Sequence, residues 1–391
     1  MKILMLSDSP FTNTGYATVT LEILNGLNKL GHECHLMAHN YIGQDIPAGN
    51  IKLKDGTPFN FHLYSNGRLA YSQDLIVPRI REIKPDFFGV LLDTFMVYPW
   101  FLDLDFAPAF SYFYYPSDGG GGLPDGCDNI LRKVNMPIAM SRFAQKQVED
   151  CHKLKSFYIP HGVNTSRFYK LTDNEKLLLR KRWGLDNKFV IGVVARNQPR
   201  KMLDRTIKVA AEICKKIDNA IFFMHCDPFD SAAGFSILKL IERYNLQNRF
   251  IFSGVKFHSG FSYQQMNEIY NLMDIFLLTT SGEGFGVPII EAQSCEVPVV
   301  VTDYTTTKEL VLDDGQSGEA IKLSSEVTGS WAVERAIMDD NDCIDKIMKL
   351  YNDKDLRIKY GQNGRNKCLN IYDWNKIIPQ WENLFKKIKG E

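Results

Sequence analysis

The 391-residue sequence has no long apolar run and no excess of charge of either sign. Its longest apolar stretches, such as residues 87–92 and 109–115, are far shorter than the roughly 20 residues that a helix needs to cross a bilayer, so we expect no transmembrane segment. The 46 basic residues (lysine and arginine) are balanced by 46 acidic residues (aspartate and glutamate). Because no net field attracts polyanions, we expect no nucleic acid partner, and any anionic ligand must be held locally.

Signatures of metal and dinucleotide binding are also missing. The eight cysteines form no Cys-x-x-Cys pair and have no histidine nearby at zinc-ligand spacing, so we expect reduced thiols and no metal site. The turn after the first apolar run is not a Gly-x-Gly-x-x-Gly fingerprint, which removes the main support for a nicotinamide or flavin cofactor. Residues 1–7 are too short for the apolar core of a signal peptide, so we expect a cytoplasmic protein.

Length and periodicity predict two α/β domains. Residues 2–7 and 34–39 are apolar runs of strand length, and residues 15–30 between them have helical spacing, which makes one β-α-β unit. The alternation continues along the chain and starts again after the charged stretch 172–183, with apolar runs at 189–194, 220–225, 250–253, 275–279 and 298–302. We therefore predict two Rossmann-like, doubly wound parallel sheets, one in residues 1–165 and 373–391 and one in residues 166–372.

The end of the chain, residues 372–385, is aromatic-rich and amphipathic, and it contains Pro379. We expect a helix there that returns to the first domain, with a kink or break at the proline. The alternative is a terminal helix that caps the second domain.

The most informative segment, residues 281–292, reads Ser-Gly-Glu-Gly-Phe-Gly-Val-Pro-Ile-Ile-Glu-Ala and directly follows the apolar run 275–279. Pro288 suits the first position of a helix. The glycines let the backbone N–H groups of Phe285, Gly286 and Val287 approach a ligand closely. A phosphate fits at such a helix N-terminus.

Glu283 and Glu291 lie eight residues apart in this segment, one on the loop and one in the first helical turn, so both carboxylates can border one pocket. Carboxylates accept hydrogen bonds from sugar or ribose hydroxyls but repel a bare phosphate, so the pattern favours a sugar nucleotide. The alternative is a glycine turn before an ordinary helix, in which Glu291 only complements the helix dipole.

With this spacing, residues 283–291 resemble the Glu-x7-Glu motif of glycosyltransferase family 4, which has the GT-B fold. The resemblance implies two Rossmann-like domains facing across a cleft, with the donor on the C-terminal side and the acceptor on the N-terminal side. It also implies that Glu283 contacts the transferred sugar, that Glu291 contacts the nucleotide ribose, and that the amides of residues 285–287 contact the diphosphate.

A second loop, after the apolar run 189–194, carries three cations that can clamp a diphosphate: Arg196, Arg200 and Lys201. The family has an arginine and a lysine five residues apart here, which match Arg196 and Lys201 and would neutralise charge on the leaving group. For Arg200, a solvated basic side chain is a credible alternative. Family members usually have glycine where this chain has Met202 and Glu296, which leaves the shape of those two turns open.

Two candidate residues lie in the first domain. Gly15 ends a loop after the first predicted strand and resembles the family glycine that approaches the donor phosphate. Many family members carry a histidine in the region of residues 114–123; this chain has none there, and Asp118 is our candidate to replace it. An aspartate before four glycines is also a common turn former, which is the alternative for Asp118.

The resemblance implies a retaining, metal-independent transfer of a hexose-type sugar from a UDP- or GDP-sugar to a glycan, lipid-linked or protein-linked acceptor. No cofactor is required, and peripheral membrane contact is compatible with the sequence. Two alternatives stay open: a nucleotide-sugar epimerase of the same fold, and a binding module that has lost transfer. Met202, Glu296 and the missing histidine would suit the latter.

Overall fold

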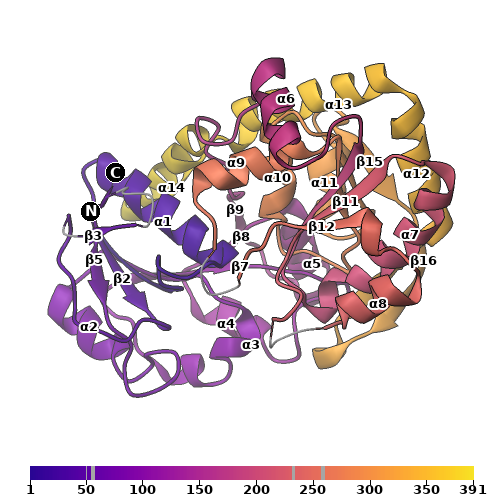
Figure 1. Cartoon of the computed structure of the whole chain (residues 1–391). Coiled ribbons are helices and arrows are strands. Elements are labelled where there is room, and N and C mark those ends of the chain that lie inside the picture. Colours follow the sequence, from indigo (N-terminus) through magenta and orange to yellow (C-terminus); the bar gives the residue numbers. More distant parts are fainter. Residues whose placement is uncertain (50, 54–57, 231–233, 257–259) are drawn as a thin grey trace. The chain divides into compact units, whose positions relative to one another are not determined.

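The structure is a computed structural model that describes residues 1–49, 51–53, 58–230, 234–256 and 260–391. The chain divides into two compact units, each built on one parallel sheet with helices packed around it (Figure 1). The first unit comprises Met1–His161, Gly329–Val333 and Trp374–Glu391, and the second comprises Gly162–Thr328 and Glu334–Asp373. This architecture confirms the predicted pair of α/β domains.

The first unit contains a seven-stranded sheet in the order β5-β2-β1-β6-β7-β8-β9, and its strand pairs are parallel. The inner strands are apolar on both faces, as expected for strands that helices cover on both sides. The strands are β1 (Lys2–Ser7), β2 (Glu33–Ala38), β5 (His62–Tyr64), β6 (Phe87–Val90), β7 (Phe110–Tyr115), β8 (Met136–Ala139) and β9 (Phe157–Tyr158). A short antiparallel pair, β3 (Ile51–Lys52) with β4 (Pro58–Phe59), lies outside this sheet.

The helices of the first unit follow the strands in alternation. Two of them begin at a capping side chain: Thr14 accepts from the Ala17 N–H before α1, and Ser141 accepts from the Ala144 N–H before α5. They are α1 (Gly15–Lys29), α2 (Ile76–Ile83), α3 (Thr94–Val97), α4 (Asp128–Lys133), α5 (Arg142–His152) and α14 (Trp374–Lys389), with the 3₁₀ turn η1 (Trp100–Asp103).

The terminal helix α14 belongs to the first unit, which confirms the predicted return of the chain. Its Trp381 and Phe385 rings pack on Tyr112 of the sheet, with centroid separations of 5.7 and 5.5 Å. A Cβ atom on Gly26 of α1 would lie 2.5 Å from Ile378, so only glycine permits this close approach. The helix continues through Pro379, so of the predicted kink or break the break is wrong, because the buried aromatic face outweighs one missing hydrogen bond; the kink stays a prediction.

The second unit contains a six-stranded sheet in the order β12-β11-β10-β13-β14-β15, again with parallel pairs. Every residue of the strands Phe189–Val194 and Ile275–Leu278 is buried. The strands are β10 (Phe189–Val194), β11 (Ala220–His225), β12 (Phe250–Phe252), β13 (Ile275–Leu278), β14 (Val299–Thr302) and β15 (Gly318–Ile321).

The helices of the second unit are α6 (Asp173–Arg182), α7 (Leu203–Lys216), α8 (Ile237–Arg243), α9 (Tyr263–Leu272), α10 (Val287–Ser294), α11 (Thr306–Leu312), α12 (Asp340–Asn352) and α13 (Lys354–Lys367). A π-helical turn η5 (Cys368–Tyr372) follows α13, and 3₁₀ turns occur at η2 (Pro199–Lys201) and η3 (Gln247–Arg249). The 3₁₀ turn η4 (Ser330–Ala332) falls in the Gly329–Val333 segment of the first unit. An antiparallel hairpin of β16 (Leu323–Thr328) and β17 (Glu334–Met338) was not predicted, because its first strand is polar and exposed.

Candidate functional site

The predicted donor residues flank the topological switch point of the second sheet. From β10 the chain order runs outward to β11 and β12, and from β13 it runs the other way to β14 and β15. The loops that follow β10 and β13 therefore diverge at the carboxyl edge of two adjacent strands, where ligands bind in open α/β sheets. One loop carries Arg196, Arg200 and Lys201, and the other carries Glu283.

Glu283 is held between two of these cations. Its carboxylate lies 2.6 Å from the Lys201 Nζ atom and 2.9 Å from the Arg200 guanidinium. Only 4% of Glu283 and 8% of Lys201 are exposed. Arg200, whose alternative was a solvated basic side chain, is thus 28% exposed at its side chain but ion-paired to a buried carboxylate.

Charge compensation keeps this buried carboxylate ionised. Burial alone would raise the pKa of Glu283, but the charges and hydrogen bonds of Arg200 and Lys201 outweigh it and lower the pKa to about 2. The group of three carries a net charge of about +1, counted as two cations and one anion at neutral pH. It can therefore attract an anionic ligand.

Backbone contacts fix the two loops to each other. The carbonyl oxygen of Arg200 accepts from the Ser281 N–H at 2.8 Å and from the Ser281 hydroxyl at 3.0 Å. The Thr279 hydroxyl lies 3.0 Å from the Met202 carbonyl. The position of Lys201 beside Glu283 is thus set by the backbone of both loops.

Met202 and Glu296, the two departures from family glycines, both adopt left-handed backbone conformations. The φ angle is +50° at Met202 and +57° at Glu296. Left-handed backbone is the conformation that glycine adopts without steric cost. Both turns therefore keep a shape that glycine would favour, and Glu296 forms an ion pair with Lys170 at 3.0 Å.

Arg196 is placed differently from Arg200. Its guanidinium forms two hydrogen bonds to the buried Asp230 carboxylate, at 2.6 and 3.2 Å. Such a bidentate pair fixes the guanidinium in one orientation. Asp230 was missed in the sequence because nothing near it marks it as the partner of a residue 34 positions earlier.

The loop after β13 ends at the N-terminus of α10. Gly286 has a φ angle of +103°, and a Cβ atom there would lie 2.9 Å from Ile289, so the position requires glycine. Phe285 is buried against Tyr372, with ring centroids 6.0 Å apart. The helix begins at Val287, one residue before the predicted start, and Pro288 occupies its second position.

Glu291 has a different environment from Glu283. Because α10 starts at Val287, Glu291 opens the second turn instead of ending the first as predicted. Its carboxylate accepts from the Tyr270 hydroxyl of α9 at 2.6 Å. Burial raises the pKa of Glu291 to about 7, against the hydrogen bond, which lowers it. Tyr270 was missed because buried tyrosines at helical spacing are usually core residues.

The two candidates of the first unit lie at the carboxyl edge of its sheet. Gly15 is the exposed first residue of α1, and a Cβ atom there would meet nothing within 4 Å. Asp118 follows β7 and is partly buried. Their predicted roles stay predictions.

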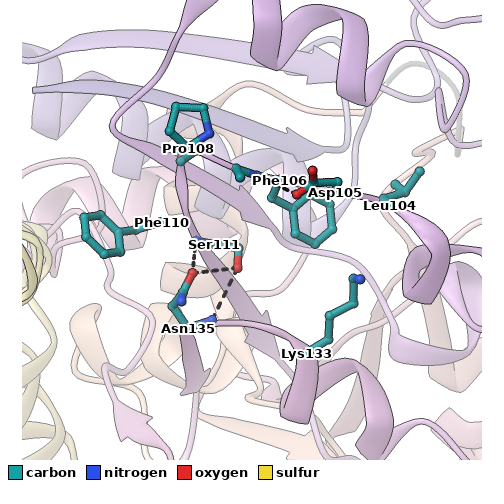
Figure 2. A pocket seen from close by; sticks show the side chains of 10 residues that line it. Leu104, Asp105, Phe106, Pro108, Phe110, Ser111, Lys133 and Asn135 are labelled. Carbon is teal, nitrogen blue, oxygen red and sulfur yellow. Dashed lines mark hydrogen bonds between the residues drawn. The ribbon is translucent and has the colours of Figure 1, made fainter.

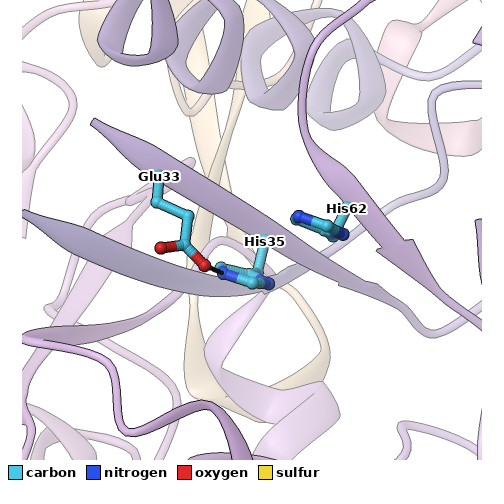
Figure 3. A group of neighbouring side chains, drawn as sticks. All are labelled: Glu33, His35 and His62. Atoms are coloured by element: carbon cyan, nitrogen blue, oxygen red, sulfur yellow. Dashed lines mark hydrogen bonds and ion pairs between the residues drawn. The ribbon is translucent and has the colours of Figure 1, made fainter. Parts of the chain in front are cut away.

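Among the residues that the structure describes, one group of three could offer ligands to a metal: Glu33, His35 and His62 (Figure 3). The two imidazole rings are stacked, with centroids 4.7 Å apart and planes 14° apart. A ring nitrogen binds a metal through a lone pair in the ring plane, so parallel stacked rings cannot both ligate one ion without turning. The His35 nitrogens instead face Glu33 and Tyr64, each at 2.9 Å.

A cavity of about 310 Å³ lies at the opposite, amino-terminal end of β7 in the first unit (Figure 2). Ser111 and Asn135 lie on its wall and are hydrogen-bonded to each other at 3.0 Å. It contains none of the predicted site residues, and ligands of α/β sheets bind at the other edge. We therefore assign it no role.

Residues 175–367 match the family described as Glycosyl transferases group 1. The second unit thus carries a domain of this family, which confirms the resemblance noted in the sequence. The alpha-galactosylglucosyldiacylglycerol synthase of Streptococcus pneumoniae is 32% identical over 161 residues, or 40% of this chain and 40% of that protein. The chain spans less than half the length of the first curated relatives it matches.

Solved structures resemble the whole chain. Sucrose-phosphate synthase from Thermosynechococcus elongatus has a TM-score of 0.78 at 16% identity, covering 100% of this chain and 99% of that one. Anabaena HepE in complex with UDP and glucose has a TM-score of 0.74 at 16% identity, covering 99% and 100%. These likenesses confirm the predicted GT-B fold. In the described part of the chain, no helix has both the length and the apolar character to cross a membrane.

Proposed function

We propose that this protein is a retaining glycosyltransferase that moves a hexose-type sugar from a UDP- or GDP-sugar to a glycan, lipid-linked or protein-linked acceptor. The observation that carries the proposal is the buried Glu283 carboxylate between Lys201 and Arg200, at the switch point of a glycosyl transferases group 1 domain. The UDP and glucose bound to HepE support a nucleotide-sugar donor.

In this proposal the donor lies across the N-terminus of α10. The amides of Phe285, Gly286 and Val287 donate to the diphosphate, because the first N–H groups of a helix have no partner within it. Lys201 adds positive charge, and Glu283 accepts from hydroxyls of the transferred sugar. Arg196 is held by Asp230, and its contribution to neutralising the leaving group is part of the proposal.

Glu291 completes the donor site by accepting from the ribose hydroxyls. Its ionised form is the stronger acceptor, and the Tyr270 hydroxyl favours that form. This role explains why a carboxylate occupies a position whose burial raises its pKa towards neutrality.

Transfer breaks the bond between the anomeric carbon and the phosphate oxygen, and it forms a bond from that carbon to the acceptor oxygen. We propose attack on the face that the phosphate leaves, with the acceptor proton passing to the departing phosphate. Negative charge on the leaving group is met by Lys201 and the α10 amides, so the reaction needs no divalent ion. Asp118 and Gly15 keep their predicted roles, at the acceptor and at the donor phosphate.

Product analysis tests the proposal. The protein is incubated with UDP- and GDP-sugars, with and without chelator, and with sugar, glycolipid and glycopeptide acceptors, and products are identified by mass spectrometry. We expect one donor to give a chelator-insensitive product whose anomeric configuration matches the donor. A donor isomerised without acceptor would favour the epimerase, and binding without turnover would favour the binding module.

A further inference from the structure

The turn between β14 and α11 holds a threonine in a strained backbone conformation. Thr305 has φ +53° and ψ −136°, which lies near a region that only glycine populates freely. A β-branched side chain makes such a conformation especially unfavourable. Thr305 is also buried, at 6% exposure, so the strain is not relieved by a mobile loop.

The Thr305 hydroxyl is hydrogen-bonded to both polar backbone atoms of Glu283. It accepts from the Glu283 N–H at 3.0 Å and donates to the Glu283 carbonyl oxygen at 3.1 Å. The neighbouring Thr306 hydroxyl lies 2.9 Å from the Gly284 carbonyl oxygen and 3.2 Å from the Glu283 carbonyl oxygen, so the contact to the Glu283 N–H is specific to Thr305. One side chain therefore fixes both polar backbone atoms of the residue whose carboxylate pairs with Arg200 and Lys201.

The common structural explanation does not apply to this hydroxyl. A threonine just before a helix usually caps it, by accepting from a backbone N–H of the first turn. Thr305 precedes α11 but makes no such bond to it. Glycine would remove the backbone strain, yet it would also remove both bonds to Glu283.

We propose that Thr305 is a positioning residue that fixes the Glu283 backbone and thereby aims its carboxylate at the reacting sugar. The inference rests on the proposed function, because it takes Glu283 as the group that contacts the sugar. The strain is kept because the fixed direction of Glu283 is needed for turnover, as is typical of strain at functional sites.

Four variants test the proposal: Thr305→Ser, Thr305→Ala, Thr305→Gly and the control Thr307→Ala. The Thr307 hydroxyl lies in the same turn but binds the carbonyls of Thr302 and Tyr304 instead of Glu283. For each variant, kcat and donor KM are measured with the best donor, and Tm is measured without ligand.

We expect Thr305→Ser to keep kcat within about twofold, and Thr305→Ala and Thr305→Gly to lose about tenfold or more in kcat with little change in KM. Thr305→Gly should melt at or above the wild-type temperature because it releases the strain. Thr307→Ala should lower Tm while kcat changes little.

A Thr305→Gly variant with wild-type kcat would overturn the proposal, as would a serine variant as slow as the alanine one. If the wild type turns over no donor, the proposed function fails and this inference fails with it. If the wild type is active and all Thr305 variants match it, only the inference fails.

Discussion

Replacing Glu283 by glutamine should make the protein bind nucleoside diphosphates more tightly, although it removes a group proposed to contact the sugar. In the structure the Glu283 carboxylate forms ion pairs with Lys201 and Arg200, at N···O distances of 2.6 and 2.9 Å. A diphosphate that uses these cations has to share them with the carboxylate. Glutamine keeps the size and the hydrogen-bonding oxygen but gives up the charge.

The pKa of Glu283 sets the size of the effect. It falls from an ordinary 4.5 to about 2. At about 1.4 kcal/mol per tenfold change in the ionisation constant, the cations favour the ionised form by about 3 kcal/mol after burial is included. If the diphosphate and the Glu283 carboxylate compete fully for the cations, removing the carboxylate charge should tighten diphosphate binding by roughly 100-fold. If both anions share the cations, the gain should be about tenfold.

The assay is calorimetric titration of UDP and GDP into wild type, Glu283→Gln and the control Glu319→Gln. Glu319 is a buried carboxylate of the same unit that also pairs with two lysines, Lys349 at 2.6 Å and Lys346 at 3.4 Å. The control should lose stability but bind diphosphate as the wild type does. An unchanged or weaker affinity in Glu283→Gln, with a normal control, would refute competition for the cations.

Further predictions concern individual residues. Met202→Gly and Glu296→Gly should each stabilise the protein by about 0.5–1 kcal/mol, because glycine adopts their left-handed backbone freely; unchanged melting temperatures would contradict this. The affinity for a nucleotide sugar should rise with pH through about 7 as Glu291 ionises. The midpoint of this rise should move to higher pH in Tyr270→Phe, and the pH dependence should flatten in Glu291→Gln. Because the folded carboxyl keeps a proton that the unfolded chain releases above pH 4.5, Glu291 should lower stability as pH rises from about 4.5 to 7. Gly15→Ala should leave Tm unchanged or higher, since its Cβ atom meets nothing, while weakening donor binding; equal donor affinity would remove Gly15 from the site.

The strand-turn-helix around Glu283 could be predicted because its signals are local. An apolar run of strand length, a glycine turn and a proline at the helix start all fall within residues 275–292. Gly286 adopts a left-handed conformation in which a Cβ atom would lie too close to Ile289, only three residues further on.

Partners distant in sequence could not be predicted in the same way. Three cations share one short loop, and only the path of the backbone decides that Arg200 meets Glu283 while Arg196 meets Asp230. The Thr305 strain is equally invisible, because threonine gives no sequence sign of a positive φ angle.

The two departures from the family's glycines could be interpreted only in part from the sequence. The sequence shows that Met202 and Glu296 replace glycines, but only the backbone shows that both turns keep a left-handed residue. The return of α14 was predictable from its aromatic face, whereas its continuity through Pro379 depends on packing that the sequence does not display.

Thermal unfolding with nucleotide sugars, with and without chelator, tests the central claim that the Glu283–Lys201 site binds a nucleotide-sugar donor. At about 100 times its dissociation constant, a donor should add roughly 2.7 kcal/mol of stability. We predict a shift with one UDP- or GDP-sugar that survives the chelator and is lost in Lys201→Met. No shift with any donor, or a shift that Lys201→Met retains in full, would contradict the account.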